Sequence, residues 1–539
     1  MRVLAVLLAC ACLAAPAADA EDGAFVGVMP LDAAQAQNRD AARMARFEPL
    51  EGVLVASAPI AWGRIEPDAK AAGGSPYRWK QLDEAVLVWQ LTGLAPVLVL
   101  SPESAWGSVA KDKSAWALQV RKTLPAAETV GALRGATGAT PPKAAAWGRW
   151  ERFVRAVVER YDGDGHQDMP GLRRPVRHVQ VLGGVDPAWW LGDEEQLLRL
   201  MHHAIQGAHD ASKGCRVLAP TFDLQATGHE PFPDAREWAY RINQITPTNA
   251  QLLPRLETRR HFAMARRILA MPRLFDILCH AGSEHIGDDV ANLGFLRRTL
   301  DEAGAGAKGL WLLDNPTRKL GAARDPRVVA PKKAERRLRQ RWLPAARNPR
   351  HPQHGRAREW MRRGQAFDLV RGLCRARAAG ADAVLFFAPW DGLPQQHPKR
   401  ERGADQGLFV ETAGASTTAG LKPTPSGYAL AQALKHLRGH RSAGETPLGA
   451  PGHSVIFQFD RAVNRPWVTV LMLAPRLSWA GAPGEALPVR SVLVTLPSGA
   501  YTLEWVQTGP AAPRRREVVS DGSLTIELGP EPVYVIPKR

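Results

Sequence analysis

The chain has 539 residues, of which 45% are hydrophobic and 23% are charged, the balance of an ordinary globular protein. This length allows one large domain with a smaller domain attached. The formal net charge is +17, but no nucleic-acid recognition motif accompanies it, so we do not expect a nucleic-acid partner. No segment reaches the roughly 20 consecutive apolar residues that a membrane helix needs, and a transmembrane protein is not expected.

Residues 1–20, MRVLAVLLACACLAAPAADA, have the pattern of a secretory signal peptide. Arg2 precedes a short apolar run, and small residues close the segment at Ala18-Asp19-Ala20. Such a segment is removed during export, so we expect cleavage after Ala20 and a secreted or periplasmic protein. The apolar run before Cys10 is very short for a lipoprotein signal, and a lipid anchor is not expected.

Three cysteines lie beyond the signal: Cys215, Cys279 and Cys374. An odd number cannot pair completely within one chain, and all three lie in apolar strands or a helix, so we expect buried thiols. Their spacing relative to histidines does not match a zinc site. The sequence therefore predicts neither a metal nor a cofactor.

Short β-type runs alternate with helix-length segments through residues 21–440. Helical periodicity is clearest at 79–93, 150–161 and 365–380. The alternation predicts eight parallel strands and a TIM (β/α)8 barrel. The eight runs are 24–29, 52–58, 96–101, 178–183, 216–222, 275–280, 309–314 and 382–387.

Residues 441–452 have the composition of a linker, and 453–539 then contain β-rich runs separated by turn signals. We expect a small C-terminal antiparallel β-sandwich there. Two insertions are expected in the barrel, at about 107–147 and 318–363, the first of them flexible within 122–146.

The segment 321–363 concentrates positive charge, with fourteen Lys and Arg against three Asp and Glu. Such a segment is typical either of a solvated basic loop or of a surface that binds an anionic polymer, such as an acidic polysaccharide.

Several blocks of the sequence resemble secreted retaining glycoside hydrolases of the β-xylosidase, α-iduronidase and cellulase-like type, which combine a (β/α)8 barrel with a trailing β-sandwich. The blocks are WGRIEPDAKAAGGSPYRWKQLDEAVLVWQLTGLAPVLVL (62–100), FVRAVVERY (153–161), FDILCH (275–280), KGLWLLD (308–314) and GQAFDLVRGLCRARAAGADAVLFFAPWD (364–391). The resemblance implies a saccharide ligand and two catalytic carboxylates, an acid after strand four and a nucleophile after strand seven, about 5–5.5 Å apart.

The chain departs from that pattern where the chemistry would occur. Gly183 and Gly184 stand where the resemblance implies Asn and the acid Glu, and Ser57 stands where it implies Arg. Asp314 occupies the nucleophile position but is shorter than Glu by one methylene group, and a misplacement of about 1 Å can cost about 100-fold in rate. The catalytic pair is therefore predicted to be incomplete.

Other carboxylates are candidates for a replacement acid. Asp186 follows Gly184 by two residues, and Glu230 and Glu284 follow later strands. Each also has an ordinary interpretation, because an Asp before Pro is common in turns and loop acids are usually solvated.

Aromatic and polar residues near the predicted strand ends are candidates for binding a sugar. Indole rings stack against the C–H faces of sugars, and about half of these tryptophans are equally expected in the core. The candidates are Trp62, Trp106, Trp189, Trp190, His280, Trp311, Trp390 and Asp391.

Three functions follow. The favoured one is a secreted glycoside-hydrolase-like protein that binds a polysaccharide or oligosaccharide without a complete catalytic pair. The second is an active glycosidase with Asp314 as nucleophile and a relocated acid. The third is a basic scaffold that docks an anionic cell-surface polymer through 321–363.

Overall fold

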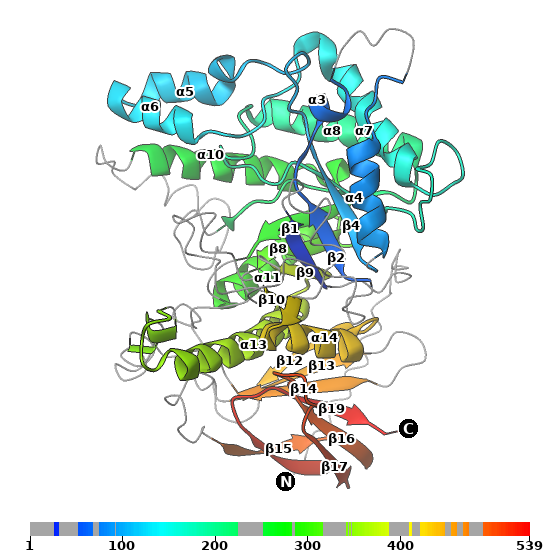
Figure 1. Ribbon diagram of the computed structural model, residues 1–539, viewed down its shortest axis with the longest axis vertical. Helices are drawn as coiled ribbons and strands as arrows, with labels where there is room; N and C mark the ends of the chain where they lie inside the picture. Colours follow the sequence, from blue (N-terminus) through cyan, green and yellow to red (C-terminus); the bar gives the residue numbers. More distant parts are fainter. Residues whose placement is uncertain are drawn as a thin grey trace.

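The chain folds into a parallel α/β barrel followed by an antiparallel C-terminal domain (Figure 1). No helix in the described part of the chain has the length and apolarity to cross a bilayer. The computed structural model describes residues 26–31, 52–67, 75–91, 93–224, 252–282, 286–315, 341–342, 344–346, 348–386, 409–411, 421–447, 454–460, 467–473 and 489–538.

Eight parallel strands close into a ring, which is the TIM barrel that the sequence predicts. Each strand pairs with the next in chain order, and β9 pairs with β1 to complete the circle. A short ninth strand, β3 (Ile60–Ala61), adds to β4. The ring strands are β1 (Val26–Leu31), β2 (Leu54–Ser57), β4 (Ala95–Ser101), β5 (His178–Val181), β6 (Arg216–Leu218), β7 (Ile277–Ala281), β8 (Gly309–Asn315) and β9 (Ala383–Phe386).

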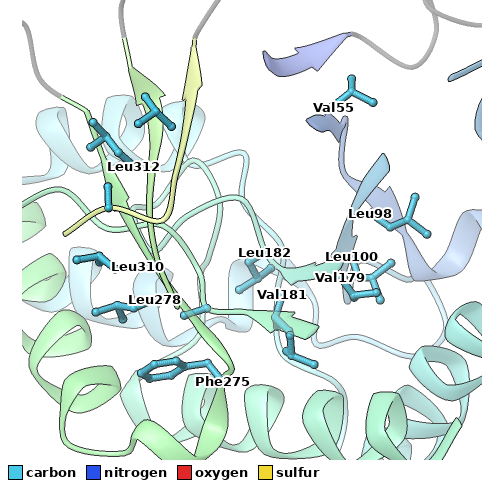
Figure 2. Packing of buried hydrophobic residues seen from close by; sticks show 14 of the residues in the cluster. Val55, Leu98, Leu100, Val179, Val181, Leu182, Phe275, Leu278, Leu310 and Leu312 are labelled. Atoms are coloured by element: carbon cyan, nitrogen blue, oxygen red, sulfur yellow. The ribbon is translucent and has the colours of Figure 1, made fainter. Parts of the chain in front are cut away.

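Alternate residues of each strand serve two different cores, because successive side chains of a strand point to opposite faces. On β4, Val97 and Val99 belong to the apolar cluster of the barrel interior, and Leu98 and Leu100 belong to the cluster between the strands and the helices. Figure 2 shows part of this outer cluster, with Val179 and Val181 of β5 beside β4. The near-continuous apolar runs in the sequence reflect this burial on both faces.

The helices cover the outside of the ring. The longer ones follow the strands as the periodicity predicts, and α7 and α8 pack against each other. The helices are α3 (Trp62–Ile65), α4 (Lys80–Leu91), α5 (Ala115–Thr123), α6 (Ala126–Gly135), α7 (Trp147–Tyr161), α8 (Glu194–Ala211), α10 (Leu252–Leu269), α11 (Ile286–Glu302), α13 (His354–Ala378) and α14 (Pro425–Leu437).

The first insertion is more regular than expected. Residues 122–146 include α6 and a short 3₁₀ turn, and α5 and α6 share an apolar cluster with Leu191 and with Leu256 of α10. Burial of Trp116, Val120 and Leu124 in that cluster explains why an Ala- and Gly-rich segment is ordered.

The end of the second expected insertion belongs to α13, which begins at His354 rather than near 365. Ala357 and Met361 of this added length pack on Trp342, Ala345 and Ala346. Arg350 and Arg356 are exposed in the described part of 321–363.

The C-terminal domain is a two-sheet antiparallel sandwich. A six-stranded sheet, in the order β12-β13-β14-β19-β16-β17, packs on the β15–β18 pair through a shared apolar core that includes Leu471, Val494 and Leu528. The strands are β12 (Arg441–Pro447), β13 (Ser454–Asp460), β14 (Val468–Leu473), β15 (Arg490–Thr495), β16 (Gly499–Trp505), β17 (Arg515–Ser520), β18 (Ser523–Leu528) and β19 (Val533–Pro537), and a separate hairpin joins β10 (Phe409–Glu411) to β11 (Leu421–Pro423).

The linker expected at 441–452 begins as a strand. Residues 441–447 form β12 and pair with β13 along its length. A polar segment that contains glycine can form an edge strand, because its backbone hydrogen bonds to the neighbouring strand do not require apolar side chains on a buried face.

A buried carboxylate joins the last barrel helix to the sandwich. Glu504 of β16 accepts hydrogen bonds from Gln432 Nε2 (2.8 Å) and His436 Nε2 (2.8 Å) of α14, and from Arg515 Nε (2.7 Å) of β17. Burial opposes ionisation, but the hydrogen bonds from His436 and Gln432 outweigh it and lower the pKa of Glu504 to about 2.

This contact predicts a pH-dependent stability. Because the folded pKa of Glu504 lies below its ordinary value, its contribution is complete above about pH 4.5 and is lost as the pH falls toward 2. Glu504→Gln should lower the Tm at pH 7. Between pH 5 and pH 3, the Tm of this variant should decrease less than the Tm of the wild type, as measured by circular dichroism. Glu517→Gln on the neighbouring strand, where the carboxylate is half exposed, is the control and should change the Tm little. Equal pH profiles for Glu504→Gln and the wild type would contradict the prediction.

Candidate functional site

The carboxyl ends of the ring strands form the face at which TIM barrels carry their sites. β5 is the fourth strand of the ring and β8 the seventh, so Gly183–Gly184 and Asp314 occur where the resemblance places the acid and the nucleophile. Asp314 is the penultimate residue of β8, and its side chain lies outside the described residues. Ser57, at the end of β2, is buried and accepts a hydrogen bond from Val99 N (2.9 Å), so it links two strands.

The indole ring of Trp189 covers Gly183 and Gly184. A Cβ atom added at Gly184 would lie 2.8 Å from Trp189 Cδ1, and one added at Gly183 would lie 2.6 Å from Cε3 and nearer still to Cζ3. These separations are shorter than van der Waals contact. The ring therefore fills the volume that the first atom of any side chain at 183 or 184 would take.

A tight turn positions Trp189. The carbonyl oxygen of Asp186 accepts hydrogen bonds from Trp189 N (2.9 Å) and Trp190 N (2.9 Å), and Asp186 Oδ1 accepts one from Ala188 N (2.8 Å). Asp186 thus has the turn-forming role that its place before Pro187 indicates.

The first insertion holds the same turn from the other side. Ala139 N donates to Trp189 O (2.9 Å), and Leu191 N donates to Ala139 O (2.8 Å). Gly138 allows this approach, because a Cβ there would lie 2.5 Å from Trp190 N. The insertion is therefore part of the candidate site.

Leu182 gives the chain its unusual direction after β5. Its φ is 64°, in the left-handed region that bulky residues rarely adopt. Burial of its side chain and a hydrogen bond from Leu182 N to Leu100 O (2.9 Å) hold it there. Such conformations cost about 1–3 kcal/mol and are concentrated at functional sites.

Among the described residues, Asp186 interacts electrostatically with Asp223, Glu257 and Arg260. Burial raises the pKa of Asp186, and Asp223, which follows β6, adds to the rise. Burial and then Asp186 raise the pKa of Glu257 on α10. Arg260 of α10 is buried and donates through Nη2 to Trp190 O (3.0 Å) and Gly192 O (2.5 Å), which fixes α10 to the β5 loop.

His280, a candidate sugar-binding residue in the sequence, lies in the core of the barrel. It is completely buried; its Nδ1 donates to Phe222 O (3.0 Å), and Asn292 Nδ2 lies 3.4 Å from its Nε2. His261 of α10 lies nearby and accepts a hydrogen bond from Asp223 N (2.5 Å). Burial, with a contribution from His280, lowers the pKa of His261 to about 4, so its ring is neutral at pH 7.

Trp62 and Trp106 form a structural cluster with Glu66. Trp62 Nε1 donates to Glu66 Oε2 (2.7 Å), and Trp106 Nε1 donates to the Glu66 carbonyl oxygen (2.8 Å). Arg149 bonds to the Glu66 carboxylate and stacks over Trp106, with its guanidinium carbon 4.4 Å from the ring centroid. Trp62 has no exposed surface, and Trp106 is half-buried, with Arg149 over its ring.

Two other expected sugar-binding tryptophans are also core residues. Trp190 is fully buried and its Nε1 donates to Asp193 O (3.3 Å). Trp311 lies in the barrel interior, its ring centroid 5.0 Å from that of His178. Both side chains point into the protein. Nearness to a strand end did not reveal this, because successive side chains of a strand point to opposite faces. Glu230, Glu284, Trp390 and Asp391 lie outside the described residues.

One group of carboxylates in the described chain has the spacing of a metal site, and it is at the opposite end of the barrel. Oxygens of Asp162, Asp164 and Asp168, in the loop that leads into β5, lie within 4.8 Å of one another. Asp168 already accepts hydrogen bonds from Gly163 N (2.9 Å) and Gly165 N (2.7 Å). These hydrogen bonds hold the loop together, and the group is separate from the candidate site.

Sequence reasoning missed Asp223, Glu257 and Arg260. The signal for Asp223 was its position directly after the predicted strand 216–222, at the same end of the barrel as Asp314. Glu257 and Arg260 carry no such signal, because they lie on a helix that reaches the carboxyl end only through tertiary packing.

Comparisons with solved structures agree with this fold. The chain is similar to a glucosidase from Croceicoccus marinus (TM-score 0.52, 12% identity, 96% of each chain covered). It is also similar to a monomeric β-xylosidase from Caulobacter crescentus (0.51, 11%, 96% of each chain) and to the GH39 enzyme from Xanthomonas axonopodis pv. citri (0.50, 13%, 95% of this chain and 94% of that chain). No protein-family model and no curated protein matches the sequence. The shared feature is the fold: a TIM barrel with an antiparallel C-terminal domain.

The close approach of Trp189 predicts that even a methyl group at 183 is harmful. Gly183→Ala should destabilise the protein by about 1–3 kcal/mol, the usual effect of overpacking, measured by denaturant unfolding. In a Trp189→Ala background, adding Gly183→Ala should cause much less destabilisation, because the ring no longer occupies the space of the methyl group. Gly131→Ala in α6, where a Cβ meets nothing within 4 Å, is the control and should stabilise slightly. An unchanged stability of Gly183→Ala would contradict the geometry.

Proposed function

We propose that the protein is an exported carbohydrate-binding protein that uses a glycosidase-like barrel without a complete catalytic pair. The observation that carries the proposal is the packing of Trp189 on Gly184, 2.8 Å from the point where a side chain would begin. A glycine cannot donate a proton through a side chain, and the ring leaves no room for a glutamate. The names of the similar structures, a glucosidase and a β-xylosidase, support glucose- or xylose-based oligosaccharides as first ligands to test.

The test separates binding from hydrolysis. We expect xylo- or gluco-oligosaccharides to raise the Tm of the mature chain and to give a measurable Kd by calorimetry. We expect no release of 4-nitrophenol from 4-nitrophenyl xyloside or glucoside above the rate without protein. Asp314→Ala should leave that background unchanged. Hydrolysis by the wild type that disappears in Asp314→Ala would refute the pseudoenzyme proposal.

A relocated acid is the second candidate, and the environment of Asp186 favours it. A general acid must retain its proton near the working pH, and both burial and Asp223 raise the pKa of Asp186. Asp186 also follows Gly184 by two residues at the same end of the barrel. An active enzyme would then combine Asp186 as acid with Asp314 as nucleophile.

For this candidate, Asp186→Asn is the informative variant. An asparagine Oδ1 preserves the acceptor for Ala188 N, so the turn should survive. If Asp186 is the acid, kcat should fall by about 100-fold or more, and least for substrates with 4-nitrophenol as the leaving group. Asp210→Asn, at an exposed position on α8, is the control. Full activity of Asp186→Asn would exclude this residue as the acid.

A further inference from the structure

Trp189 differs from its neighbour Trp190 in two properties: the burial of its side chain and the hydrogen bonding of its indole N–H. Trp190 is fully buried and its indole N–H is bonded to Asp193 O. Trp189 is half-buried. Within the described part of the chain, its Nε1 has no hydrogen-bond acceptor and is not enclosed. A tryptophan N–H that is not enclosed can donate to a ligand.

The ring is also held in one orientation. One part of it rests on the backbone of Gly183 and Gly184, and the turn that carries it is bonded to Asp186 and to Ala139. A preorganised aromatic surface loses little conformational entropy when a ligand binds. A flat apolar ring with an available N–H at its edge suits a sugar, whose C–H groups stack on the ring and whose hydroxyls accept the proton.

A carboxylate belongs to the same turn. Asp186 precedes Trp189 in the turn, and its carbonyl oxygen accepts the hydrogen bond from Trp189 N (2.9 Å). A carboxylate can accept hydrogen bonds from the hydroxyl groups of a sugar. The turn therefore combines an aromatic ring with a hydrogen-bond acceptor close to it in the chain.

We propose that Trp189 is a stacking platform for a saccharide, located where a glycosidase of this fold would carry its acid. This inference rests on the proposed function, since it assumes that the barrel binds carbohydrate. It adds the residue that contacts the ligand. Gly183 and Gly184, which lack a Cβ atom, leave the space in which the ring lies.

The experiment measures the binding of xylotetraose and cellotetraose by calorimetry on the full chain. At least one of these two neutral tetrasaccharides should bind. Trp189→Ala should weaken this binding by about tenfold, and Trp189→Phe, which keeps a ring but loses the N–H, should weaken it by less. Trp467→Phe, a partly buried tryptophan in the sandwich, is the matched control and should bind as the wild type does.

A second measurement uses the wild type, because Trp189→Ala uncovers Gly183 and Gly184 and also tests the stability of the turn. Tryptophans are oxidised with N-bromosuccinimide, with and without the bound tetrasaccharide, and each indole is followed by mass spectrometry. The saccharide should slow the oxidation of Trp189 and leave that of Trp467 unchanged.

The outcomes separate this inference from the proposed function. If neither neutral tetrasaccharide binds the wild type, the proposed function fails and the inference falls with it. If one binds, but Trp189→Ala keeps the affinity or Trp189 is not protected, the platform is refuted and carbohydrate binding stands.

Discussion

The contact between the Trp189 ring and the backbone of Gly183 and Gly184 governs the carboxyl end of this barrel. It requires two residues without a Cβ, a left-handed Leu182 to direct the chain, and the turn at Asp186 to bring the ring back over the strand end. Any side chain at 184 would compete with the ring for the same volume. The absence of a side chain at 183 and 184 and the position of the tryptophan ring are therefore structurally linked.

The turn that carries Trp189 also helps to order the insertion after β4. Its segment around Gly138 and Ala139 bonds to the turn that carries Trp189, and α5 and α6 share an apolar cluster with α10. Arg260 of α10 then bonds to the carbonyl oxygens of Trp190 and Gly192. Three parts of the chain thus hold one turn, and a turn supported in this way can keep a strained residue.

The net charge of the chain does not describe the electrostatics near Trp189. The protein has a net charge of +17, but the pKa of Asp186, in the turn that carries Trp189, is raised by burial and by the nearby carboxylate of Asp223. Arg260 lies close to Asp186 and donates hydrogen bonds to the backbone carbonyl oxygens of Trp190 and Gly192. The local arrangement of charges, and not their total over the chain, therefore decides how this carboxyl group ionises.

The sequence by itself determined the fold. Eight apolar runs with helical segments between them specify a parallel barrel, because strands covered on both faces must be continuously apolar. The order of the strands then located Gly184 and Asp314 at corresponding strand ends. The tertiary structure alone decided the directions in which side chains point and the packing of the elements against one another. Trp62, Trp190, Trp311 and His280 all lie near strand ends yet are buried, because a one-residue shift or a turn reverses the side to which a side chain points. Residues 441–447 form a strand because β13 offers a partner, and Glu257 and Arg260 reach the site because α10 packs beside the β5 loop. Such contacts join residues distant in sequence, and local composition cannot encode them.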